Sequence, residues 1–206
     1  MHQISIRESM KQIIEAEAHA LQAIPYSDAY EKAVGLIIEH VHRRGGKLVA
    51  SGMGKAGQIA LNIATKFSST GTPAVSIHPS EAQHGDIGML QPNDIMLLVS
   101  NSGNTAEVVE LGAIAKRLYP EIPIIVLTGD DKSELPRMAD VTLLTGGPDE
   151  VCPLGLTPTT STTVMSVIGD VLVASVTRLT DFTAEEYAKR HQGGSLGYKS
   201  RKEADI

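Results

Sequence analysis

The sequence has little of what nucleic-acid-binding proteins depend on. Aromatic residues make up 3% of the 206 residues, and the 18 basic residues form no run among the 24 acidic ones, which leaves a net charge of −6. Aromatic platforms for stacking bases and basic tracks along a phosphate backbone are therefore missing. These absences argue against nucleic acid as a partner.

Cysteine and long apolar segments are also scarce. Cys152 is the single cysteine, which excludes an intramolecular disulfide and fits a reducing cytoplasm. The charged N-terminus MHQISIRESMKQ lacks the apolar core of a signal peptide, and no apolar stretch approaches the ~20 residues of a membrane helix. No pair of potential ligands has convincing metal-site spacing. We therefore expect a cytoplasmic protein without a membrane segment or a metal.

The apolar residues that are present form short runs rich in β-branched side chains. Each run is continuous rather than alternating, as is typical of parallel strands covered on both faces. Helical patterns separate most of the runs, so we expect a five-stranded, doubly wound α/β fold of the flavodoxin or Rossmann type. The expected strands are Lys47–Ser51, Ala74–His78, Ile95–Ser100, Ile122–Thr128 and Val141–Thr145.

Helical spacing of apolar residues places helices before, between and after these strands. The expected helices are Ile6–Ile24, Ser27–Arg44, Gln58–Phe67, Ala106–Leu118, Thr159–Leu179 and Ala184–Lys189, with one or two helical turns within Ser133–Met138. No linker or repeat divides the chain, so we expect one domain over residues 1–206. Residues 1–45 form its N-terminal helices, residues 46–197 its sheet core and active-site segments, and residues 198–206 a loose tail.

Ligands of open parallel sheets bind beyond the carboxyl ends of the strands, where this sequence is rich in glycine. GMGKAG at residues 52–57 matches the dinucleotide-binding pattern G-x-G-x-x-G after a strand. That function also needs an acid near the end of the second strand, and no Asp or Glu occurs between Gly52 and Ser80. The phosphate-binding pattern of ATPases is absent as well. A nucleotide cofactor is therefore not expected.

The stretch SNSGNT at residues 100–105 follows the third expected strand and precedes a helix. The amides at a helix start, its dipole and several hydroxyls together form a cradle for an anion the size of one phosphate. The alternative is that Ser102 or Asn104 only caps the helix. Six small polar residues supply more donors than a cap uses, which favours anion binding.

Four segments, taken in order, resemble one family. They are residues 52–89 (GMGKAGQIALNIATKFSSTGTPAVSIHPSEAQHGDIGM), residues 100–107 (SNSGNTAE), residues 152–163 (CPLGLTPTTSTT) and residues 191–197 (HQGGSLG). The chain resembles the sugar isomerase (SIS) fold and, more narrowly, the D-arabinose 5-phosphate isomerase family. Longer members carry two CBS domains after the last motif, so this chain resembles a short form without them.

The resemblance implies an aldose–ketose isomerase that interconverts D-ribulose 5-phosphate and D-arabinose 5-phosphate through an enediol, with no cofactor. It implies four catalytic residues, each with a simpler alternative. The simpler alternatives are that Lys55 is a solvated loop lysine and that Glu107 is a carboxylate that complements a helix dipole. Likewise, His84 is then an exposed loop histidine and His191 a tail residue. The residues implied to bind substrate and its phosphate are Gly54, Ser100, Asn101, Ser102 and Thr105.

The resemblance also implies partners and leaves alternatives open. His191 is implied to enter the active site of a neighbouring subunit within a homotetramer, and a nucleotide sugar is a candidate feedback inhibitor. The product would supply 3-deoxy-D-manno-octulosonate for lipopolysaccharide or capsule. The alternatives are an isomerase of another phosphosugar and a non-catalytic regulator that binds a sugar phosphate.

Two departures from the family pattern and one further cluster bear on specificity. Gln192 stands where the family usually has Pro, and Ala56-Gly57-Gln58 stands where it has Ser-Gly-His. The hydroxyl-rich stretch Thr157–Thr163 has two interpretations, namely plain capping of the following helix and contact with substrate.

Overall fold

The computed structural model describes residues 5–204 and contains one all-parallel sheet of five strands in the order β2-β1-β3-β4-β5. This order is that of the flavodoxin-like doubly wound fold, so the expected fold class is confirmed. The strands are β1 (Leu48–Gly52), β2 (Ala74–Ser76), β3 (Ile95–Val99), β4 (Ile124–Thr128) and β5 (Val141–Leu144).

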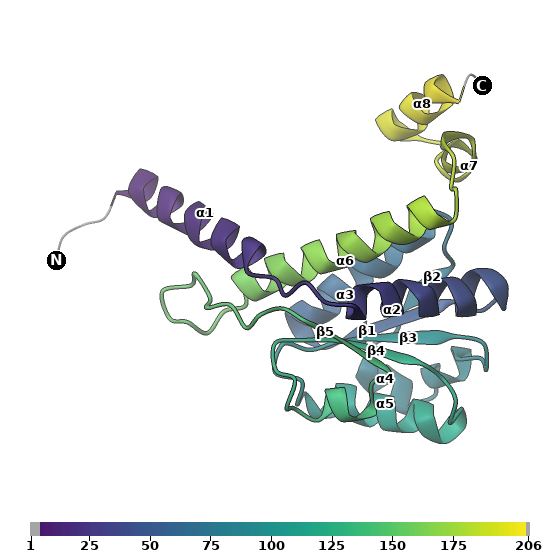
Figure 1. Cartoon of the computed structure of the whole chain (residues 1–206), viewed down its shortest axis with the longest axis horizontal. Coiled ribbons are helices and arrows are strands. Elements are labelled where there is room, and N and C mark those ends of the chain that lie inside the picture. The colour runs from purple at the N-terminus through teal and green to yellow at the C-terminus, as the bar shows by residue number, and fades with distance from the viewer. Residues whose placement is uncertain (1–4, 205–206) are drawn as a thin grey trace.

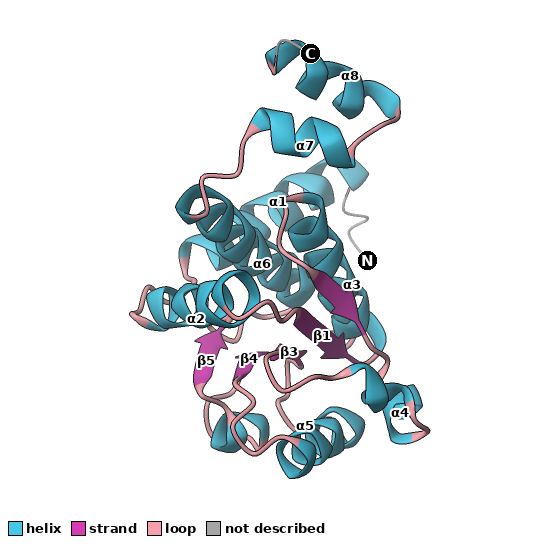
Figure 2. Ribbon diagram, turned by 90° about the vertical axis from the view of Figure 1, so that its right-hand side faces the viewer, coloured by secondary structure: helices cyan, strands magenta, loops and turns pink. Residues whose placement is uncertain are grey.

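Helices cover both faces of the sheet (Figures 1 and 2). Side chains alternate along β3, where Leu97 packs with α2, α3 and α6 while Met96 and Leu98 pack with α4 and α5. Burial on both faces explains why the strands are continuously apolar. The helices are α1 (Ile6–Gln22), α2 (Ala29–Ile37), α3 (Gly54–Ser69), α4 (Pro79–Gln83), α5 (Ala106–Leu118), α6 (Thr160–Leu179), α7 (Ala184–Arg190) and α8 (Gly194–Glu203).

Two parts of the chain project from this body. Most of α1 extends away from the sheet on one side, while α7 and α8 pack on each other beyond the far end of α6 (Figure 1). The strands end near the start of α6, so α7 and α8 lie toward the opposite, amino-terminal edge of the sheet. Helix α6 is ~30 Å long for its 20 residues, so its two ends lie far apart.

The observed elements differ from the expected ones in four places. The second expected helix continues from α2 as a π-helix over Ile38–Arg43. Helix α4 and a 3-10 helix over Asp86–Met89 follow β2, where no helix is expected, and α3 begins at Gly54 rather than Gln58. In the tail, α8 replaces the expected loose segment up to Glu203, and residues 205–206 lie outside the described range.

Helix α6 corrects the expectation that no apolar stretch approaches the length of a membrane span. By length and composition alone its 20 residues meet that criterion. A core helix meets it too, and α6 buries Val164, Ile168 and Leu172 completely along α3 and the sheet. Its apolar character is therefore accounted for in part by packing in the core.

Candidate active site

The first glycine-rich loop joins β1 to α3 at the carboxyl edge of the sheet. A Cβ atom on Gly57 would lie 2.6 Å from the carbonyl oxygen of Gly52, and a Cβ on Gly52 would lie 2.7 Å from that of Val99. Gly54 adopts a left-handed backbone with φ of +59°. Close packing of strand and helix therefore accounts for the G-x-G-x-x-G spacing without a dinucleotide.

Lys55 lies in the first turn of α3, with an exposed side chain. Met53 is the N-cap of this helix, and no side chain caps its first turn in the part of the chain that the structure describes. The amides of a first helical turn have no partner within the helix. Lys55 and these amides thus present positive charge at the carboxyl edge.

The polar loop between β3 and α5 places several hydroxyl groups next to the start of α5. Ser100 is buried, and its Oγ lies 2.8 Å from Oγ1 of Thr105, which is the N-cap of α5. Ser102 Oγ accepts the amide of Asn104, and no side chain caps the first turn of α5 among the described residues. The alternative that Ser102 or Asn104 caps the helix is therefore wrong.

Glu107 and His84 reach the same edge from neighbouring βα units. Glu107 is partly exposed in the first turn of α5, and His84 is exposed at the C-terminal end of α4, which packs beside α5 (Figure 2). The units that carry Lys55, His84 and Glu107 begin with β1, β2 and β3, which are adjacent strands. Adjacent strands lie about 4.8 Å apart, so the three loops span ~10 Å, the size of a pentose phosphate.

Glu150 was missed by the sequence analysis, although it organises the hydroxyl-rich stretch at the start of α6. Its carboxylate accepts the amide (2.6 Å) and hydroxyl (2.9 Å) of Thr159, together with the amide and hydroxyl of Ser161. Burial raises the pKa of the Glu150 carboxyl, but these hydrogen bonds outweigh burial and hold the pKa below its ordinary value. A carboxylate thus occupies the N-terminal end of α6, where the helix dipole favours negative charge.

Replacement of Glu150 by Gln is expected to lower the melting temperature at pH 7 and to matter less in acid. Because its pKa is lowered on folding, the carboxylate adds stability above about pH 4.5, and that stability is lost as the pH falls through the folded pKa. Calorimetry of Glu150→Gln from pH 7 to pH 3.5 measures this, with the exposed Asp149→Asn as control. A difference from wild type that stays constant with pH would contradict it.

Cys152 lies two residues beyond Glu150 and is partly exposed. Hydrogen bonds, first from the Thr157 hydroxyl and then from backbone amides, lower the pKa of the thiol to about 7. The thiol is therefore partly ionised at neutral pH. Within residues 5–204 no three His, Cys, Asp or Glu side chains gather as metal ligands.

His191 lies at the opposite edge of its own subunit. His191 directly follows α7, which comes after the C-terminal end of α6. The segment that joins α6 to α7 packs on Gly71, in the turn that precedes β2. Lys55 stands at the start of α3 and Thr70 at its end, which separates the two edges by ~22 Å along that helix. The structure therefore brings Lys55, His84 and Glu107 to one edge and His191 to the other.

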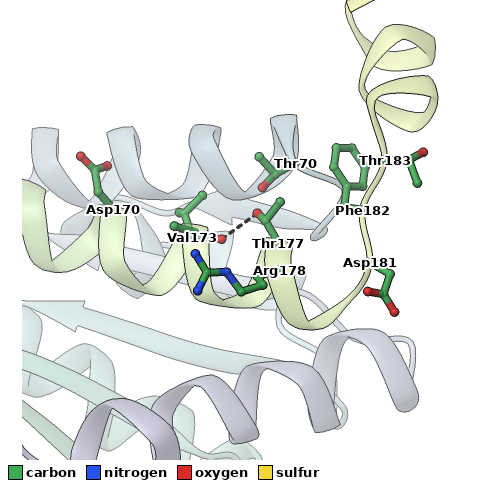
Figure 3. Close-up of a pocket in the computed structure, with 9 residues that line it drawn as sticks. Thr70, Asp170, Val173, Thr177, Arg178, Asp181, Phe182 and Thr183 are labelled. Atoms are coloured by element: carbon green, nitrogen blue, oxygen red, sulfur yellow. Dashed lines mark hydrogen bonds between the residues drawn. The ribbon is translucent and has the colours of Figure 1, made fainter. Parts of the chain in front are cut away.

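A pocket of about 730 Å³ lies between the C-terminal ends of α3 and α6 rather than at the carboxyl edge (Figure 3). Thr70, Thr177 and Phe182 are among the residues that line it, and none of the sequence-predicted site residues does. The sequence-predicted residues Lys55, His84 and Glu107 instead lie on loops and helix ends at the carboxyl edge.

Comparison with known proteins identifies the class to which this fold and site belong. The SIS domain family matches residues 41–175, so the chain belongs to the SIS-domain family. Among curated relatives, the arabinose 5-phosphate isomerase KdsD of Salmonella typhi is 41% identical over 194 residues, or 94% of this chain. The match covers 58% of that relative, so the chain spans little more than half the length of the curated relatives it matches.

Solved structures of similar length agree with this assignment. A candidate phosphosugar isomerase involved in capsule formation from Bacteroides fragilis is 60% identical with a TM-score of 0.91, covering 92% of this chain and 99% of its own. An Escherichia coli CFT073 protein in complex with arabinose 5-phosphate is 33% identical with a TM-score of 0.82, covering 93% and 100%. Both structures thus match this chain over more than nine-tenths of its length.

Proposed function

We propose that this chain is an aldose–ketose isomerase that interconverts D-ribulose 5-phosphate and D-arabinose 5-phosphate. One observation carries the proposal: Lys55, His84 and Glu107 lie on three adjacent βα units around the uncapped start of α5. The naming of the Salmonella relatives and the arabinose 5-phosphate bound to the Escherichia coli relative support the same substrate. The alternative of a non-catalytic regulator leaves this set of titratable side chains without a role.

The phosphate of the substrate binds at the start of α5. Its charge is complemented by the helix dipole, the free amides of the first turn and the hydroxyls of Ser102 and Thr105. Gly54 lets the neighbouring loop lie close to the sugar because glycine, which the left-handed backbone there favours, has no side chain. Asn101 is exposed in the same loop and is a further donor to the substrate.

Catalysis transfers one proton between two carbons. Glu107 accepts the proton from C1 of ribulose 5-phosphate while the C2 carbonyl oxygen gains a proton, which yields the 1,2-enediol. The O1–H proton then leaves and a proton returns to C2, which yields the aldehyde of arabinose 5-phosphate. Lys55 stabilises negative charge on the enediolate, and His84 moves protons between the two oxygens. These steps need no metal or redox cofactor.

The site is completed by a second copy of the chain within a homotetramer. Lys55 stands at the start of α3, whose length to Thr70 is ~22 Å, and His191 lies beyond the end of α6 at the opposite edge, so we infer that it serves a neighbour's site. The projecting helix α1 supports assembly, since Ile6, Met10 and Ile14 line one face at four-residue spacing and are 57–87% exposed. We place this assembly in the cytoplasm, with neither a membrane segment nor nucleic acid as partner.

Mixing two inactive variants tests whether His191 acts between subunits. Glu107→Gln and His191→Asn are each expected to be inactive, whereas a mixed dimer contains one site with both residues intact. In a refolded equimolar mixture, two-fold symmetry predicts recovery of about a quarter of wild-type activity. No recovery despite verified mixed oligomers would place His191 in its own subunit's site.

The product would supply 3-deoxy-D-manno-octulosonate for surface polysaccharide. The 60% identical Bacteroides fragilis relative supports capsule as the destination. A nucleotide sugar derived downstream is the proposed feedback inhibitor, because its phosphate fits the same cradle. We expect CMP-linked octulosonate to inhibit the enzyme in a concentration-dependent way. Excess ribulose 5-phosphate is expected to relieve this inhibition.

A substrate panel tests the assignment. Purified protein is assayed with ribulose 5-phosphate, with hexulose and heptulose phosphates and with unphosphorylated ribulose. The proposal predicts isomerisation of ribulose 5-phosphate in preference to the longer sugars and none of free ribulose, because the phosphate provides the anchor. Preference for a longer phosphosugar would establish the alternative isomerase.

A further inference from the structure

The imidazole of His191 is held rigidly on the projecting α7–α8 segment. Its ring stacks on the ring of Tyr187 with centroids 3.7 Å apart and an interplanar angle of 4°. Its Nδ1 lies 3.0 Å from the backbone carbonyl oxygen of Tyr187. A carbonyl only accepts hydrogen bonds, so Nδ1 carries the proton, and Nε2 of the neutral ring is the free acceptor.

The stack is continuous with the body of the protein through Phe182. The Tyr187 ring meets the Phe182 ring edge to face, with centroids 6.4 Å apart and planes at 73°. Phe182 packs on Gly71, where an added Cβ would lie 2.5 Å from the ring, and the Arg190 guanidinium lies 5.3 Å from the Phe182 ring centre. In Figure 3 Phe182 stands beside Thr70, where the chain leaves α6 for α7.

Helix α8 fixes the backbone of His191 as well. Gly197 packs on the carbonyl group of His191 so closely that a Cβ atom would clash with it. The last glycine of the HQGGSLG motif is thus required by packing, and the ring is held by Tyr187. The His191 imidazole is thus held through both its ring and its backbone, and it is partly exposed. Because it also lies far from the carboxyl edge of its own sheet, it is placed to act on another molecule.

We propose that Tyr187 is a positioning residue: its ring fixes the His191 imidazole with Nε2 free to exchange a proton with the sugar bound to a second copy of the chain. This inference rests on the proposed isomerase function for its catalytic part. The stack itself is a property of the free protein and is testable without substrate.

The test compares wild type with Tyr187→Leu, Tyr187→Phe and the control Tyr198→Leu. Tyr198 lies on α8 and is 70% exposed. Loss of the stacked ring is expected to lower kcat roughly 10- to 100-fold with little change in KM, as for a slightly misplaced catalytic group. Phe keeps the stack, so Tyr187→Phe and Tyr198→Leu are expected to retain wild-type kcat.

A second measurement needs no activity. Deuterium exchange at C2–H of each histidine, followed by mass spectrometry, reports how the ring is held. Faster exchange at His191 in Tyr187→Leu alone, with unchanged exchange at His84, supports the proposal. Wild-type exchange and kcat in Tyr187→Leu, or loss of kcat in Tyr187→Phe, would overturn it. If the wild-type protein has no isomerase activity, the proposed function is overturned instead. The exchange measurements then still test whether Tyr187 holds the His191 ring.

Discussion

Replacement of Glu107 by Gln is expected to reduce the rate of sugar-phosphate isomerisation by 10²- to 10⁴-fold, the typical contribution of a general base. The amide has nearly the shape of the carboxylate but does not accept the carbon-bound proton. Because Gln leaves the amides and hydroxyls of residues 100–105 in place, KM is expected to change much less than kcat. Steady-state kinetics with ribulose 5-phosphate measure both quantities.

The matched control is Glu110→Gln on the same helix. Glu110 is exposed one turn further on, where its carboxylate lies 3.1 Å from the Arg117 guanidinium, away from the start of α5. This variant is expected to keep wild-type kinetics. Full activity of Glu107→Gln would instead identify a histidine, His84 or His191, as the base.

Replacement of Asp94 by Ala is expected to destabilise the fold by about 3 kcal/mol, the low end of the range for breaking a buried ion pair, because Asp94 is buried while the Lys47 side chain is 25% exposed. Asp94 is 1% exposed and joins the starts of β1 and β3. Its carboxylate accepts the Lys47 ammonium at 2.6 Å, the Lys47 amide at 2.9 Å and the Gln91 amide at 2.8 Å. The alanine variant leaves all three donors without this acceptor.

The Lys66–Asp170 ion pair provides the control because it has the same 2.6 Å separation at the surface. Its side chains are 37% and 55% exposed, so Asp170→Ala is expected to cost about 0–1 kcal/mol. Urea unfolding of both variants gives the two free energies. Equal losses would show that distance rather than burial determines the contribution of such pairs here.

The central sheet was predictable because burial on both faces leaves a direct mark on the sequence. All five strands were expected, and each observed strand begins or ends within two residues of its expected bounds. Helix α5 was predicted with its observed bounds, since a polar loop precedes it and its apolar residues keep helical spacing. The fold class and the position of the polar loop before α5 follow from these local patterns.

What the sequence did not reveal depends on contacts between distant residues. The first turn of α3 was missed because Gly54 and Gly57 are typical of loops, whereas packing on β1 requires glycine there. Helix α8 is polar on most of its surface and is held by contact with α7, so it has no apolar periodicity to detect.

The candidate site shows the same division. Lys55 and Glu107 sit beside recognisable loops, so their types and positions indicated chemistry. Glu150 has no such motif, because its partners Thr159 and Ser161 lie nine and eleven residues further along and meet it only in the folded loop. The stack of Tyr187 on His191 was likewise invisible until the α7–α8 segment was folded.

The most direct test of the account is proton NMR of the purified protein with ribulose 5-phosphate in deuterated water. The enediol mechanism predicts that arabinose 5-phosphate accumulates with deuterium at C2, because the proton returned to that carbon exchanges with solvent. Binding of the sugar phosphate without any isomerisation would contradict the account and would establish a non-catalytic sugar-phosphate-binding protein.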